Sequence, residues 1–170
     1  IELKQKYIEE EKKLKKVLMQ KLLNPDSGIR LPGFNSQWNK TSIGEMGEVI
    51  TGNTPSTAIN DYYENGIFPW ITPTDINNKY IDNSERKLTM DGLEKARKLP
   101  AGTLLVTCIA SIGKNTILKK EGSCNQQINA LIVNDKFDVE FLYYIIENNK
   151  EYFLKIAGVT ATPIINMKTF

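Results

Sequence analysis

The sequence contains no histidine among its 170 residues. Histidine is the commonest general base and a frequent metal ligand, so its absence excludes Ser-His and Cys-His nucleophile pairs and histidine-based metal sites. Catalysis would have to depend on carboxylates or lysines. The two cysteines, Cys108 and Cys124, lack the C-x-x-C spacing of a zinc or redox motif and indicate neither a metal site nor a disulfide framework.

Two segments match chemical motifs only in part. Residues 108–115, CIASIGKN, resemble a phosphate-binding loop, but a Walker A motif needs glycine at the place of Cys108 and Ser or Thr at the place of Asn115. Asp82, Glu85 and Lys87 contain the Glu-x-Lys half of a metal-dependent nuclease signature, in a context typical of a solvated loop. No active site is assembled from these residues, and the sequence predicts neither an enzyme nor a cofactor or metal site.

Hydrogen-bonding side chains are concentrated in short segments that are typical of loops. Asn and Gln can pair with adenine, Arg and Lys with guanine or phosphate, and Ser and Thr with either kind of group. The same residue types dominate ordinary turns, so composition alone leaves both interpretations open. The candidate DNA contacts are Asn53, Thr54, Ser56, Thr74, Lys79, Tyr80, Arg86, Lys87, Ser111, Lys114, Gln126 and Gln127.

Short apolar runs separated by turn residues must position these loops. Strands are expected at residues 40–43, 48–51, 68–71, 103–109, 116–118 and 130–133. Helices are expected at residues 90–98 and at 138–156, the second capped by Asp138. Because the strands are clustered and do not alternate regularly with helices, the pattern favours an α+β domain of mixed α/β content.

The N-terminal segment has a different pattern. Residues 2–23 contain no Gly or Pro, and apolar residues recur at spacings of three, four and seven, which predicts one amphipathic helix about 33 Å long. The periodicity is equally consistent with a helix folded onto its own domain and with a coiled-coil helix that pairs with a partner helix. The predicted packing stripe consists of Leu3, Tyr7, Leu14, Val17, Leu18 and Leu22.

The formal net charge of +2 is unevenly distributed. Residues 1–23 hold seven lysines and four glutamates, whereas the other 147 residues hold 15 basic and 16 acidic groups. A nearly neutral body is a poor electrostatic binder of DNA by itself. No apolar run reaches the roughly 18 to 20 residues of a membrane span, and the N-terminus lacks the apolar core of a signal peptide, so a cytoplasmic protein is expected.

The order of several segments resembles the specificity subunits of type I restriction-modification systems. A helix ending in MQKLL at 19–23 is followed by RLPGF at 30–34 and Trp38, as at the junction between a conserved helix and a target recognition domain in that family. The resemblance continues in the same order through GEVITGNTPS at 47–56, PWITPTDI at 69–76, LPAGTLLV at 99–106, ASIG at 110–113 and NQQ at 125–127. The tail GVTATPIIN at 158–166 is similar to the entry into the next conserved helix.

This resemblance implies a non-catalytic domain that reads one half of a bipartite DNA target. The implied partners are double-stranded DNA, methyltransferase subunits and, through them, restriction subunits. The helix would pair with a second conserved helix, in the same subunit or in a second copy, because the chain is expected to be either a fragment of a two-domain subunit or a half-subunit. The expected organisation is a spacer helix at 1–23, a linker at 24–28, a recognition domain at 29–157 and the truncated start of a helical segment at 158–170. The alternative is a protein interaction module that assembles through its N-terminal helix.

Overall fold

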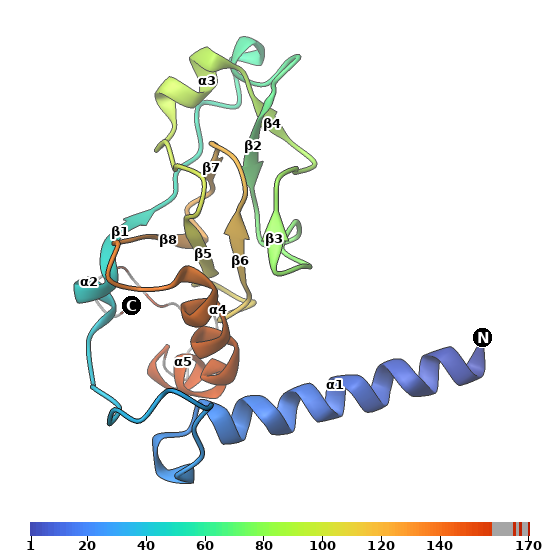
Figure 1. The fold of residues 1–170 in the computed structure, drawn as a ribbon. Helices are drawn as coiled ribbons and strands as arrows, with labels where there is room; N and C mark the ends of the chain where they lie inside the picture. The colour runs from blue at the N-terminus through green and yellow to red at the C-terminus, as the bar shows by residue number, and fades with distance from the viewer. Residues whose placement is uncertain (158–164, 166, 168–169) are drawn as a thin grey trace. The chain divides into compact units, whose positions relative to one another are not determined.

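A computed structural model describes residues 1–157, 165, 167 and 170 (Figure 1). The chain divides into two compact units, Ile1–Lys40 and Thr41–Phe170. The expected four-part organisation is finer than this division and stays a prediction. Its last part, 158–170, falls largely outside the described residues.

The first unit contains the predicted long helix, α1 (Glu2–Leu22). None of its residues is buried, and the apolar stripe is exposed over most of its length, from 45% at Val17 to 82% at Leu3. The following turn is the short helix η1 (Pro25–Ser27), capped by the side chain of Asn24. Within the described residues, no helix is long and apolar enough to cross a membrane.

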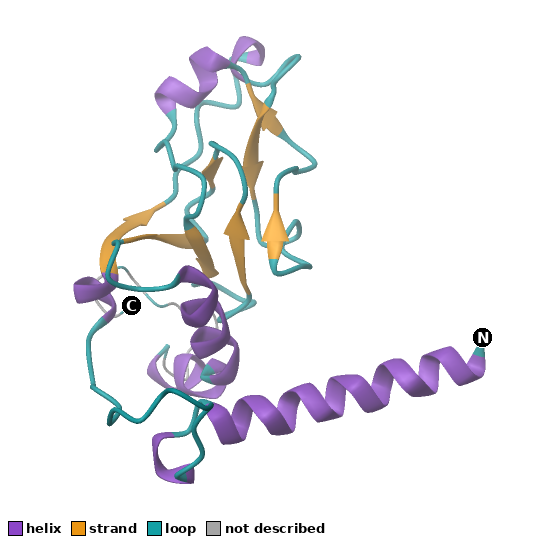
Figure 2. Ribbon diagram, in the orientation of Figure 1, coloured by secondary structure: helices purple, strands orange, loops and turns teal. Residues whose placement is uncertain are grey.

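The second unit is built on two small sheets (Figure 2). The larger sheet has the strand order β1-β8-β5-β6-β3 and is antiparallel except for the β3–β6 pair, while the smaller has the order β4-β2-β7. The strands are β1 (Gly47–Thr51), β2 (Phe68–Ile71), β3 (Tyr80–Ile81), β4 (Lys87–Leu88), β5 (Leu104–Thr107), β6 (Asn115–Leu118), β7 (Ser123–Cys124) and β8 (Ile128–Val133). The helices are α2 (Ile43–Met46), η2 (Asn60–Tyr62), α3 (Met90–Lys95), α4 (Val139–Asn148) and α5 (Lys150–Ile156). The prediction of an α+β domain with a long N-terminal helix is confirmed.

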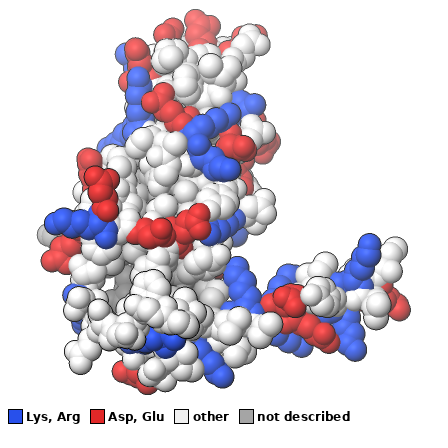
Figure 3. Space-filling model, in the orientation of Figure 1, with Lys and Arg blue, Asp and Glu red and all other residues white. Residues whose placement is uncertain are grey.

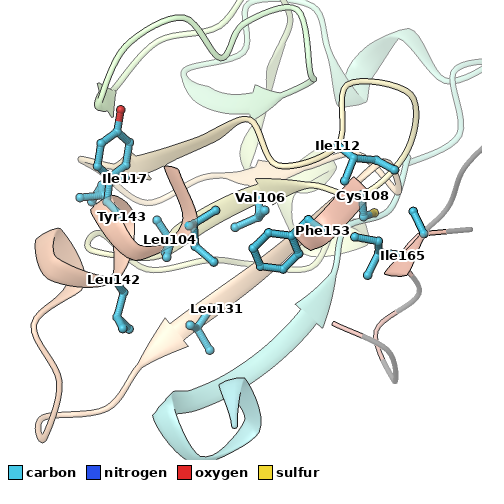
Figure 4. Close-up of a cluster of buried hydrophobic side chains, with 12 residues drawn as sticks. Leu104, Val106, Cys108, Ile112, Ile117, Leu131, Leu142, Tyr143, Phe153 and Ile165 are labelled. Carbon is cyan, nitrogen blue, oxygen red and sulfur yellow. The ribbon is translucent and has the colours of Figure 1, made fainter. Parts of the chain in front are cut away.

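The main core lies between the larger sheet and helices α4 and α5 (Figure 4). Leu104 and Val106 of β5 enter it, whereas Leu105, between them, enters a second cluster with Ile128 and Ala130 of β8. Alternate residues of a strand point to opposite faces, so both faces of this sheet are buried. Such two-sided burial explains why β5 reads as an unbroken apolar run.

A third, smaller cluster supports the opposite end of the unit from α4 and α5 (Figure 1). Trp70 of β2, Leu88 of β4 and Leu93 of α3 are its buried members, and Tyr63 packs against them. This cluster joins the smaller sheet to α3. The cluster therefore supports the loops around the smaller sheet and α3.

Several expected elements were wrong in detail. Residues 40–43 form no strand; Ser42 instead begins α2 through a reciprocal capping box with Glu45. The expected helix at 138–156 breaks at Asn149 into α4 and α5, and α3 ends at Lys95, short of residue 98. Strands β3, β4 and β7 were missed because two residues leave no periodic pattern to detect.

Candidate nucleic-acid interface

Asn53 follows β1 and fixes the loop at residues 52–59. Its side-chain amide donates to the carbonyl of Lys95 at 2.9 Å, and its side-chain oxygen accepts from the backbone N–H of Arg97 at 2.7 Å. Its backbone N–H also donates to the carbonyl of Cys124. The Asn53 side chain is thus occupied by the protein itself and ties this loop to the end of α3.

The next residue links this loop to the turn between β7 and β8. The Thr54 hydroxyl donates to the side-chain oxygen of Gln126 at 2.6 Å, and both residues are exposed. The side-chain oxygen of Gln127 accepts a hydrogen bond from the side-chain amide of Asn125 at 3.0 Å. Ser56 is exposed on the same loop. Candidates 72 positions apart in the sequence are therefore in direct contact.

Arg86 lies on two aromatic rings at the same end of the unit. Its guanidinium carbon is 4.5 Å from the Tyr63 ring centroid and 5.1 Å from that of Trp70. The Trp70 indole N–H donates to the backbone carbonyl of Asn53, which connects this stack to the 52–59 loop. Lys87 follows in β4. Sequence reasoning missed the aromatic pair, since Tyr63 and Trp70 have no spacing that sets them apart from core residues.

Lys79 and Tyr80 form a separate group, bound to α4. The Lys79 ammonium is 2.7 Å from a carboxylate oxygen of Glu140 and 4.7 Å from the Tyr144 ring centroid, and the Tyr80 hydroxyl also donates to Glu140. The hydrogen bonds from Lys79 and Tyr80 lower the pKa of Glu140, and the bond to Glu140 raises the pKa of Tyr80. The positive charge of Lys79 is thus already compensated within the protein.

Lys114 and Ser111 belong to the loop between β5 and β6. Lys114 lines an open pocket of about 220 Å³ with Asn77 and Asn78 of the loop between β2 and β3 and with residues of α4 and α5. Within the described residues Lys114 makes no ion pair, and Ser111 is exposed. Thr74, in the loop after β2, is exposed and shares a hydrogen bond of 2.8 Å with the hydroxyl of Thr72.

The other candidate chemistry finds no support in the described part of the chain. No group of three or more His, Cys, Asp or Glu side chains there could hold a metal ion, and Asp82 and Glu85 are exposed. Both cysteines are buried and unpaired. Burial raises the pKa of Cys108 to about 11 and that of Cys124 to about 12, so neither is an activated thiolate.

The surface charge of the second unit is mixed in sign. Figure 3 shows a group of Lys and Arg side chains near β4, with Asp and Glu side chains interspersed over the same face. The candidate cations also differ in whether a carboxylate compensates their charge. Arg86 and Lys114 have no carboxylate partner among the described residues, whereas Lys79 is paired with Glu140.

Comparison with known proteins gives a consistent family. A family model described as "Type I restriction modification DNA specificity domain" matches residues 35–170. The chain is 36% identical over 139 residues to the type I restriction enzyme MjaIX specificity subunit of Methanocaldococcus jannaschii. This match covers 78% of this chain and 32% of the relative. It is 32% identical over 139 residues to the HindI specificity subunit of Haemophilus influenzae, with 78% and 30% coverage.

The fold is also found in a solved structure of an HsdS subunit from Thermoanaerobacter tengcongensis. That chain superposes with a TM-score of 0.67 at 17% identity, over 99% of this chain and 39% of its own length. The present chain spans about a third of the length of the curated relatives it matches. Since the family model covers most of the sequence, the chain belongs to the type I restriction modification DNA specificity domain family.

Proposed function

We propose that this chain recognises one half of a bipartite DNA sequence as part of the specificity subunit of a type I restriction-modification complex. The observation that carries this proposal is that exposed side chains of types able to pair with bases are joined on one supported backbone. Arg86 and the Thr54–Gln126 pair are far apart in the sequence, yet are supported by the same ring of Trp70 and the loop that it holds. A rigid scaffold that presents loop side chains is a suitable base for direct readout.

The proposed role is non-catalytic. Methyltransferase subunits and, through them, restriction subunits would supply the chemistry and their own cofactors, in the cytoplasm. The stripe of α1 would pack against a second conserved helix, in the same subunit or in a second copy, because exposed apolar side chains on one helix face favour helix pairing.

The charge distribution supports dependence on partners. The body holds 15 basic and 16 acidic groups, so it has almost no net positive charge with which to attract DNA, although Arg86 and Lys114 make no ion pair with the described residues. Phosphate neutralisation supplies much of non-specific DNA affinity. We therefore expect weak binding by the chain alone and tight, specific binding by the assembled complex. A nanomolar, sequence-specific affinity of the purified chain at physiological salt would contradict this expectation.

The decisive experiment is an exchange of residues 41–157 for the matching segment of a relative, in an assembled methyltransferase complex. Genome-wide mapping of methylated sites should then show that one half of the target sequence changes while the other half and the methylation chemistry are kept. An unchanged target sequence from an active complex would overturn the proposal.

One observation favours the alternative, a protein interaction module assembled through α1. Leu14, Val17 and Leu18 are each about half exposed, which is typical of an unpartnered interface. The same exchange experiment separates the two functions. An interaction module would change which proteins copurify with the complex and would leave its target sequence alone.

A further inference from the structure

Arg86 has an unusual combination of a fixed side chain and a free functional group. Its guanidinium lies over Tyr63 and Trp70, which themselves pack edge to face with ring centroids 6.1 Å apart. Its N–H groups make neither a hydrogen bond nor an ion pair with any described residue, and the residue is exposed. Contact with two rings that are nearly perpendicular, at 77° to each other, restricts the movement of the guanidinium while leaving its N–H groups available.

The backbone of Arg86 is held as firmly as its side chain. The Trp70 backbone N–H donates to the Arg86 carbonyl at 3.3 Å and to the Ser84 hydroxyl at 3.0 Å. The Ser84 hydroxyl, which is buried, donates in turn to the Arg86 carbonyl at 2.5 Å. Both the backbone and the side chain of Arg86 are therefore held in place, the one by Trp70 and Ser84 and the other by the two aromatic rings, so that little side-chain freedom remains to be lost on binding.

The same aromatic pair also fixes the neighbouring loop. The Trp70 indole donates to the carbonyl of Asn53 at 3.1 Å, and the Tyr63 hydroxyl donates to the carbonyl of Pro55 at 2.6 Å. Thr54 lies between these two anchored carbonyls and bonds to Gln126. Tyr63 and Trp70 thus form one platform that sets both Arg86 and the Thr54–Gln126 pair.

The geometry points to Arg86 as a specificity-determining residue that reads one guanine, with Tyr63 and Trp70 as its positioning residues; this inference rests on the proposed function. A planar guanidinium can bond to O6 and N7 of guanine together, and this bidentate pair is the commonest specific contact in the major groove. A phosphate contact needs only a positive charge, for which Lys87, without such a platform, is sufficient. A guanidinium held in place against two rings is suited to such bidentate readout.

The test uses the assembled methyltransferase complex with Arg86→Ala or Arg86→Lys, and methylation mapping over all sequence variants of the target. Both variants should lose discrimination at a single G·C position of one half-site by about ten- to a hundredfold, with every other position kept. Lysine should fail as alanine does, because an ammonium lacks the planar fork. Arg86→Lys keeps the positive charge and an aliphatic stem over the rings, so it remains informative if Arg86→Ala lowers stability.

Two matched variants sharpen the result. Lys87→Ala, at the adjacent and partly exposed position, should weaken binding evenly across sequences and reduce the slope of affinity against salt by about one. Tyr63→Phe keeps the ring under Arg86 but removes the hydrogen bond to Pro55, so guanine discrimination should be kept.

Arg86 variants with unchanged discrimination, or with only the even loss expected of Lys87→Ala, would overturn the inference. If exchange of residues 41–157 leaves the target unchanged, the proposed function itself fails; if the exchange changes the target but Arg86 variants do not, only the inference fails.

Discussion

The side chain of Asn53 accepts a hydrogen bond from the backbone N–H of Arg97 at 2.7 Å and donates one to the carbonyl of Lys95. Loss of both bonds leaves a backbone donor and acceptor without their partners. Asn53→Ala should therefore lower the free energy of unfolding by about 1 to 3 kcal/mol, measured by urea denaturation. The result would identify Asn53 as a positioning residue for the loop at 52–59.

The matched control for Asn53 is Ser56→Ala on the same loop. Ser56 is exposed, so its replacement should change stability by less than about 0.5 kcal/mol. If Asn53→Ala kept full stability and weakened DNA binding by the assembled complex, the side chain would be a direct DNA contact instead.

Glu140 should make stability depend on pH in the acid range. Hydrogen bonds from Lys79 and then Tyr80 lower its pKa in the folded protein below the ordinary value of 4.5. The stabilisation is therefore present above the unfolded-state pKa and is lost as pH falls through the lowered folded-state pKa. Glu140→Gln should lower the melting temperature at pH 7, and the difference from the parent chain should shrink as pH falls below 4.5.

Glu151→Gln provides the comparison for this pH series. Glu151 is an exposed carboxylate of α5 without an ion pair among the described residues, so its variant should follow the parent profile. A Glu140→Gln difference that stays constant from pH 7 to pH 3 would mean that the effect arises from packing and not from ionisation.

Gly52 should tolerate no side chain, although its backbone is not left-handed. A Cβ added there would lie 2.3 Å from the carbonyl oxygens of both Cys124 and Asn125, which are backbone atoms that cannot rotate away. Gly52→Ala should therefore destabilise the chain by about 1 to 3 kcal/mol or more in urea denaturation. Gly44→Ala in α2 is the control, because nothing lies within 4 Å of its added Cβ. Equal stability of the two variants would contradict the close approach at Gly52.

The sequence predicted the elements with long patterns better than the short ones. The apolar runs of β2, β5, β6 and β8 and the periodicity of α1 were sufficient, because each of these patterns extends over several residues. The break at Asn149 was not predictable, since the apolar positions continue in phase from α4 into α5. The run at 40–43 was misread because Ser42 and Glu45 form a helix cap that overrides local β-propensity.

The candidate site was predictable in its residue types and not in its contacts. Thr54 and Gln126 both follow from the choice of polar loop residues, but their hydrogen bond depends on the pairing of β1 with β8. Lys79 was chosen for its charge, yet Glu140, 61 residues away, pairs with it. Only tertiary structure separates such compensated cations from those, like Arg86, that keep their hydrogen-bonding groups free.

Lys114 should contribute electrostatic affinity without contributing much stability. It lines the open pocket beside Asn77 and Asn78 and makes no ion pair with the described residues. Lys114→Ala in the assembled complex should weaken binding to all sequences alike and reduce the salt slope by about one, measured by titration at several salt concentrations. Lys136→Ala, an exposed lysine in the turn before α4, is the control and should leave the slope unchanged. A melting temperature lowered by many degrees with unchanged affinity would assign Lys114 a structural role.

The exposed stripe of α1 should govern assembly and not the folding of the chain. Leu14 and Leu18 are 51% and 47% exposed and lie one turn apart. Replacing both by Glu should leave the unfolding transition of the second unit unchanged, because neither side chain is buried. The same change should abolish pairing with a partner helix, since it places two charges in an apolar interface. Light scattering and copurification with methyltransferase subunits provide the measurement.

The control for the stripe places two glutamates on the opposite side of α1. Lys16→Glu with Gln20→Glu introduces two glutamates at the same spacing, about half a helical turn away from Leu14 and Leu18. Because this side is polar, assembly should be kept. If both double variants assembled equally well, pairing would not use the stripe, and the helix would have to serve as a spacer whose length, and not its apolar face, matters to the complex.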